Sequence, residues 1–132
     1  MKKNFVHLFV TAIIIFTCTV MINAQEKKSE YAVAEWDKTE VDLGKIAQNN
    51  PAEVVFTVTN SGDVPLVIKD VKSSCGCTVP KFTKEPVLPG KSTTITAVYN
   101  AHNAGSFSKS VIVIMNTSEG SKALVIKGVV EG

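Results

Sequence analysis

The feature that most constrains this fold is a series of short segments in which apolar and polar residues alternate, with turn-forming residues about every 8 to 12 positions. The clearest segment runs from Glu53 to Asn60, where Val54, Phe56 and Val58 fall on one face. Because strand side chains point alternately to opposite faces, this segment predicts a strand with one buried face. No segment shows a helical period, so the pattern indicates packed β-sheets rather than βαβ units.

The rest of the chain after Ala34 follows the same pattern. A proline-rich stretch from Val79 to Gly90 is expected to be a loop that crosses between sheets, because proline cannot donate a ladder hydrogen bond. Trp36 is expected in the core. Residues 34–132 are therefore predicted to form one all-β, immunoglobulin-like sandwich of about seven antiparallel strands. The further strand segments are Ala34 to Gly44 in two pieces, Leu66 to Val71, Thr93 to Tyr99, Phe107 to Met115 and Lys122 to Val130.

The first residues have the composition of an export signal. Lys2 and Lys3 precede a nearly uninterrupted apolar run from Phe5 to Ile22, and Ala24 supplies the small residue required before a cleavage site. Residues 1–24 are thus predicted to be a signal peptide that is removed, which places the mature protein in the periplasm or at the cell surface. The charged residues 25–33 are predicted to be a flexible tether.

Two alternatives to cleavage after Ala24 are open. Ile22 occupies a position where a second small residue is usual, and the apolar run is long enough to span a bilayer as an uncleaved anchor. Cys18 raises the alternative of a lipid-modified cysteine, although Phe16 and Thr17 before it are poor matches to the small residues preferred there.

Charge argues against nucleic acid as a partner. The 132-residue chain contains no arginine, and loss of Lys2 and Lys3 leaves 12 lysines against 12 acidic residues. Arginine is the residue best suited to bidentate phosphate and base contacts, and the lysines are scattered. No nucleic-acid binding, and no membrane contact after signal cleavage, is expected.

The one chemically suggestive motif is Cys75-Gly76-Cys77. In an oxidising compartment the two thiols can form a tight disulfide, structural or redox-active, since Gly76 tolerates unusual backbone angles. Two thiolates can alternatively bind a soft metal such as Cu(I), with His102 or Met115 as weak candidates for a third ligand. The third alternative is that both cysteines are small buried apolar residues. A structural role is favoured over redox or metal chemistry.

No assembled catalytic set is visible. His102 is the only histidine after residue 24, and it lies in a polar segment beside Asn103, where a solvated loop position is expected. No nucleophile-elbow motif, histidine pair for zinc or glycine-rich phosphate loop is present, so no catalytic residue and no cofactor are predicted.

Several of these features together resemble a known family. They are Asn60-Ser61-Gly62 with the following Pro65-Leu66-Val67-Ile68, the Ser74-Cys75-Gly76-Cys77-Thr78 element, Pro89-Gly90, Tyr99, Gly105-Ser106-Phe107 and Ile126-Lys127-Gly128. The chain resembles the bacterial domain-of-unknown-function family 1573, exported single domains related in pattern to Hydin-like immunoglobulin folds. The resemblance spans about residues 35–130 and implies a fold rather than a reaction. We therefore expect a non-enzymatic binding or structural module with an unidentified envelope partner, and thiol–disulfide or copper handling through Cys75 and Cys77 as the alternative.

Overall fold

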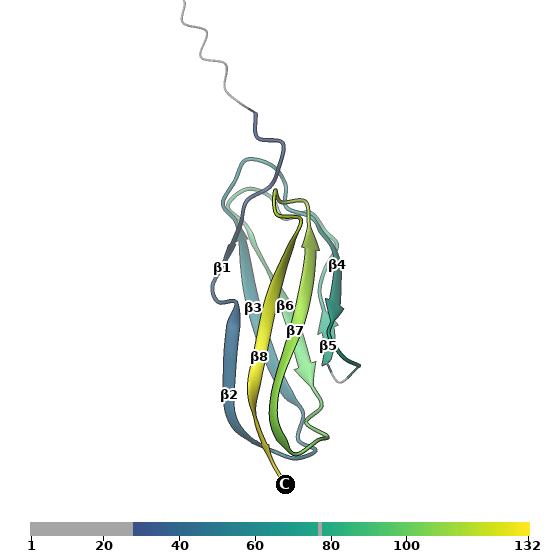
Figure 1. The fold of residues 1–132 in the computed structure, drawn as a ribbon. Coiled ribbons are helices and arrows are strands. Elements are labelled where there is room, and N and C mark those ends of the chain that lie inside the picture. Colours follow the sequence, from purple (N-terminus) through teal and green to yellow (C-terminus); the bar gives the residue numbers. More distant parts are fainter. Residues whose placement is uncertain (1–27, 77) are drawn as a thin grey trace, which may run out of the picture.

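The computed structural model describes residues 28–76 and 78–132, which form a two-layer β-sandwich (Figure 1). One sheet has the strand order β1-β3-β6-β5 and the other has the order β2-β8-β7-β4. The predicted sandwich is confirmed. None of the described residues form a helix capable of crossing a membrane. The strands are β1 (Ala34–Trp36), β2 (Glu40–Ala47), β3 (Ala52–Asn60), β4 (Ile68–Ser73), β5 (Thr78–Lys81), β6 (Ser92–Tyr99), β7 (Gly105–Met115) and β8 (Ser121–Glu131).

The strand order is that of an immunoglobulin-like domain. Sheets of the constant type contain strands A, B, E and D on one side and C, F and G on the other. The orders β1-β3-β6-β5 and β8-β7-β4 reproduce this arrangement, and β2 is added beside β8. The immunoglobulin-like prediction therefore holds at the level of topology.

The expectation of antiparallel pairing fails at β2. The chain leaves β1, crosses to the opposite sheet at residues 37–39, and β2 then runs parallel to β8. Because the chain keeps its direction while it changes sheet, it meets β8 running the same way (Figure 1). The two pieces expected between Ala34 and Gly44 correspond to β1 and β2, and β5, which was not expected, brings the described strands to eight where about seven were expected.

The prediction of a loop that crosses between the sheets from Val79 to Gly90 is wrong in position. Residues 78–81 form β5, and Pro80 pairs with Ala97 of β6. Proline is accepted there because β5 is an edge strand, bonded to β6 alone. The chain instead changes sheets between the end of β4 at Ser73 and the start of β5 at Thr78, the stretch of sequence that contains the cysteine motif.

The core lies between the sheets and follows the predicted faces. Alternate residues of each strand are buried, and the largest fully buried side chains include Phe56, Leu66, Ile68, Ile95, Leu124 and Ile126. Val111, Val113 and Met115 share the inner face of β7. Trp36 is only partly buried and packs against the core from β1. Packing begins two residues before β1, because Ala32 is buried and bridges to Thr117.

Candidate functional site

The cysteine motif lies on the crossover that joins the two sheets at the β4 and β5 edge. Two hydrogen bonds fasten its start to β7: the Ser74 amide donates to the Ser110 carbonyl (2.8 Å), and the Ser110 amide donates to Ser74 Oγ (3.1 Å). Ser73 Oγ donates to the Cys75 carbonyl oxygen at 2.6 Å. The backbone that enters the motif is therefore held by the end of β4 and by its neighbour β7.

Cys75 is partly buried and disulfide-bonded in the structure. Cys77 lies outside the described residues, so the pairing of Cys75 with Cys77 stays a prediction. Thr78, directly after the motif, is 3% exposed, and its Oγ1 has no hydrogen-bond partner among the described residues. A buried hydroxyl without a partner costs stability, which makes Thr78 a further residue of interest beside the cysteines.

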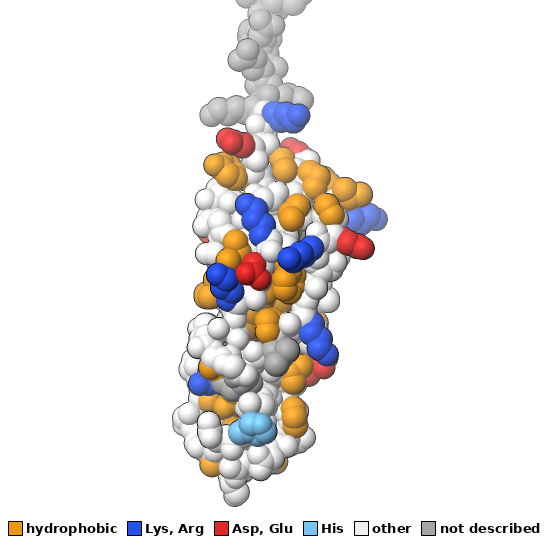
Figure 2. Space-filling model, turned by 90° about the vertical axis from the view of Figure 1, so that its right-hand side faces the viewer, with side chains coloured by type: hydrophobic (Ala, Val, Ile, Leu, Met, Phe, Trp, Pro, Cys, Tyr) orange, Lys and Arg blue, Asp and Glu red, His pale blue; other side chains and the backbone are white. Residues whose placement is uncertain are grey.

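His102 lies in the exposed loop between β6 and β7. Its Nδ1 is 3.2 Å from Asn49 Oδ1, and its carbonyl oxygen accepts a hydrogen bond from Gln48 Nε2 at 2.9 Å. Figure 2 shows this side chain in pale blue on the surface, at the end of the molecule away from the start of the described chain. These contacts tie the β6–β7 loop to the β2–β3 loop.

Met115 lies well away from the crossover. It is buried and pairs with Ile68 at the beginning of β4, whereas Ser73 at the end of β4 pairs with Val111. Met115 lies four residue steps along the strand from Val111, a span of about 13 Å. The structure therefore does not bring Met115 to Cys75. Within residues 28–76 and 78–132 there is no cluster of three or more histidine, cysteine or acidic residues suited to a metal ion.

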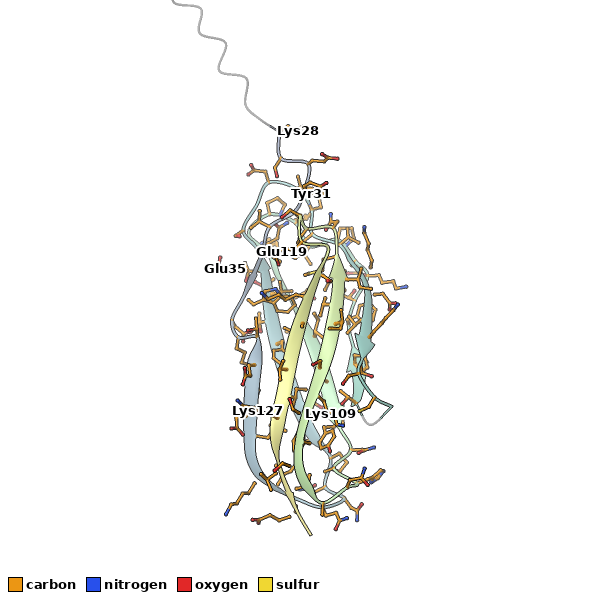
Figure 3. All side chains as sticks on the ribbon, viewed as in Figure 1. Lys28, Tyr31, Glu35, Lys109, Glu119 and Lys127 are labelled. Atoms are coloured by element: carbon orange, nitrogen blue, oxygen red, sulfur yellow. The ribbon has the colours of Figure 1, made fainter. Side chains whose placement is uncertain are left out.

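A cavity of about 210 Å³ opens at the other end of the sandwich, where the described chain begins. Trp36 and Ala34 of β1 line one side, and Met115 and Lys122 line the other. Tyr31 and Glu119 both lie at this end (Figure 3), and Glu119 is one of the lining residues. The sequence pattern placed Trp36 in the core but could not show this cavity, which exists because β1 and β8 belong to different sheets and do not pair.

Comparison with solved structures shows the same fold in proteins of low sequence identity. A protein of unknown function from Porphyromonas gingivalis superposes with a TM-score of 0.68 at 18% identity, covering 81% of this chain and 51% of that one. The PapD-like domain 7 of human CEP192 gives 0.64 at 7% identity, covering 81% and 91%. The VesB protease of Vibrio cholerae gives 0.60 at 17% identity, covering 75% and 32%.

The chain spans about half the length of the Porphyromonas gingivalis structure and about a third of the VesB protease. At these identities the likeness shows the fold alone. A search of curated proteins finds no match. The family model described as "Protein of unknown function (DUF1573)" matches residues 34–130, which are most of the chain. The chain therefore belongs to this family of proteins of unknown function.

Proposed function

We propose that this chain is an exported, non-enzymatic binding module of the periplasm or cell surface. One observation carries the proposal: β2 pairs with β8 only from Val125 onward, so residues 121–124 of β8 lie at a sheet edge that no described strand covers. An uncovered edge offers backbone donors and acceptors to an extended segment of another protein, a recurring mode of recognition by β domains.

Export follows from the N-terminal sequence. The basic start, the apolar run and Ala24 are those of a signal peptide, and this segment lies outside the described residues. After cleavage the chain has equal numbers of lysines and acidic residues and no arginine. That balance favours a protein partner in the envelope over nucleic acid.

Site-specific photo-crosslinking in living cells tests the proposal. A photo-reactive residue at Ala123, on the uncovered edge, is expected to capture one discrete partner from the envelope. The matched control carries the same residue at Thr94, which is exposed on the other sheet and is expected to capture none. Equal labelling from both positions, together with turnover of a dithiol substrate by the purified protein, would overturn the proposal.

A second candidate function rests on Cys75, whose sulfur is disulfide-bonded at a partly exposed crossover. A Cys75–Cys77 disulfide can accept two electrons from a partner dithiol: two thiols form on this chain as the partner becomes a disulfide. The reduced pair can alternatively bind Cu(I) through its thiolates.

Mass measurement before and after thiol alkylation reads the state of this pair directly. An oxidised pair gains two alkyl groups only after reduction, and copper titration of the reduced protein then reports stoichiometric binding or none. If the double variant Cys75→Ser, Cys77→Ser equals the parent in copper binding and dithiol oxidation, the second candidate fails. A large loss of thermal stability alone would assign the pair a structural role.

A further inference from the structure

Most sheet edges in this molecule carry features that discourage pairing with a strand of another chain. β1 has three residues, β5 contains Pro80, and β2 and β4 each carry a register irregularity, at Asp42 to Lys45 and at Ile68 to Asp70. Figure 2, which faces the β4 and β5 edge, shows lysine and acidic side chains among apolar ones. Short strands, proline, bulges and charges all discourage the addition of another strand.

The first four residues of β8 are the exception. Val125 donates its amide hydrogen to the Thr39 carbonyl at 2.8 Å, on the side of β8 that faces β2. In an antiparallel strand the backbone groups alternate between the two sides, so the N–H groups of Ser121 and Ala123 point to this same side. β2 has no residue opposite them, because its pairing with β8 begins at Val125.

The cavity beside Trp36 lies directly along this stretch. Lys122 belongs to both the uncovered strand and the cavity lining, and Met115 precedes the turn into β8. The lining combines the apolar residues Trp36, Ala34 and Met115 with the polar residues Thr117, Ser118 and Glu119. Its volume of about 210 Å³ is below the roughly 300–1,000 Å³ of pockets that hold whole small molecules. One apolar side chain suits it better.

We infer that the uncovered edge of β8 and this cavity form one recognition site for an extended peptide segment of a partner protein. The segment adds to β8 by backbone hydrogen bonds at Ser121 and Ala123 and inserts one apolar side chain beside Trp36. This inference rests on the proposed function and gives it a place and a ligand class. Successive side chains of the bound segment point to opposite faces of the sheet. The backbone hydrogen bonds accept any sequence, so the side chain inserted into the cavity sets which segments the site prefers.

The length of the edge restricts the partner. Four residues of β8 extend over about 13 Å, so the contacting part of the segment is a short motif rather than a whole strand of a second sandwich. A short motif can bind in this way without being part of a folded sheet in its own protein. A second copy of this chain is therefore not the expected occupant, and a concentration-dependent dimer that is lost in the variants below would contradict the inference.

Random peptides displayed on phage serve as the probe, selected on the mature chain from Gln25 to Gly132. Selected peptides are resynthesised, and their affinities are measured by fluorescence anisotropy. Ala34→Leu fills the cavity while it keeps an apolar residue in β1, and Val129→Leu is the matched control at the exposed, opposite half of β8. Thermal unfolding confirms that both variants fold.

The inference predicts peptides with a common apolar residue whose affinity falls about tenfold or more in Ala34→Leu and is unchanged in Val129→Leu. Methylation of a peptide backbone nitrogen next to that residue is expected to cause a similar loss. Peptides that bind all variants equally, or no selected peptide at all, would overturn the inference. If either result were found while crosslinking from Ala123 still captured a partner, the peptide site would be wrong but the proposed binding function would stand. Failure of the peptide site can therefore be distinguished from failure of the proposed function.

Discussion

Asn60 donates a hydrogen bond from its side-chain Nδ2 to the carbonyl oxygen of Val87, at 2.8 Å, in a fully buried position. The same nitrogen donates to the Val64 carbonyl at 2.8 Å, and Asn60 Oδ1 accepts from the Gly62 amide at 3.0 Å. One side chain thus joins the end of β3 to the loops before β4 and before β6. Asn60 belongs to the Asn60-Ser61-Gly62 element that contributes to the family resemblance, and these buried and partly buried hydrogen bonds are what its side chain provides.

Replacement of Asn60 by alanine is expected to lower the free energy of unfolding by about 2–3 kcal/mol, because the Val64 carbonyl and the Gly62 amide both lose their partner in a partly buried setting. Urea denaturation with unchanged slope is the measurement. Asn50→Ala, in the exposed turn between β2 and β3, is the control and is expected to change stability by less than about 0.5 kcal/mol. Equal stability of the two variants would contradict the role of Asn60.

Gly128 lies opposite Phe107, and a methyl group there would approach the Phe107 ring to 3.0 Å and the Gly44 carbonyl oxygen to 2.8 Å. The Phe107 ring is itself stacked on Tyr99, with centroids 4.2 Å apart. Gly128→Ala is therefore expected to destabilise by about 1–3 kcal/mol.

Gly76→Ala is the control for this variant, because, apart from the two adjacent residues, no described residue has an atom within 4 Å of a methyl group at Gly76, and the φ of Gly76 is outside the left-handed region. Thermal unfolding compares the two. A midpoint for Gly128→Ala that equals that of Gly76→Ala would show that β7 and β8 do not approach as described.

Thr78→Val is expected to leave stability unchanged or to raise it by up to about 1 kcal/mol, since it removes a buried hydroxyl that has no partner among the described residues. Denaturant unfolding of the oxidised protein gives this value. A loss of more than about 1 kcal/mol would mean that the hydroxyl is satisfied in solution. A changed rate of thiol alkylation in the reduced variant would instead connect Thr78 to the cysteine chemistry.

Lys127 forms an ion pair with Glu40 across the parallel β2 and β8 strands. The hydrogen bond from its ammonium to the Glu40 carboxylate, and then the charge of that carboxylate, raise the pKa of Lys127 above the ordinary value of 10.5. Because the folded-state pKa is the higher one, the stabilisation is fully present below the unfolded-state pKa. It is lost as the pH rises through the folded-state pKa.

Glu40→Gln is accordingly expected to lower the pKa of Lys127, with little effect on stability at neutral pH because both side chains are about half exposed. Titration of the lysine side-chain resonance by NMR measures the shift. Glu53→Gln, an exposed acid on the other sheet, is the control. A Lys127 pKa that is the same in both variants would exclude the pair in solution.

The side-chain pattern predicted which face of each strand is buried far better than it predicted which strands pair with one another. The alternation of Val54, Phe56 and Val58 depends only on local backbone geometry and is reproduced in the burial of β3. The parallel pairing of β2 with β8 depends on where the chain crosses between sheets at residues 37–39, which side-chain alternation does not encode. Trp36 is partly exposed for the same reason, since it borders the gap that this crossing leaves.

The candidate site was likewise predictable only in part. The cysteine motif stood out by residue type, but its position on the crossover, and the distance of Met115 from it, come from the register of β4 on β7. The uncovered edge at Ser121 and Ala123 has no sequence signature, because the residue types and their alternation are the same whether or not another strand pairs beside them.

Amide hydrogen exchange along β8, followed by NMR on the mature protein, tests whether Ser121 and Ala123 form an unpaired sheet edge. Fast exchange is expected at Ser121 and Ala123, whose N–H groups face the uncovered side. Slow exchange is expected at Lys122 and Leu124, which bond to β7, and at Val125, which bonds to Thr39. Protection of Ser121 and Ala123 equal to that of Lys122 and Leu124 would contradict this expectation, because the edge of β8 would then already be paired.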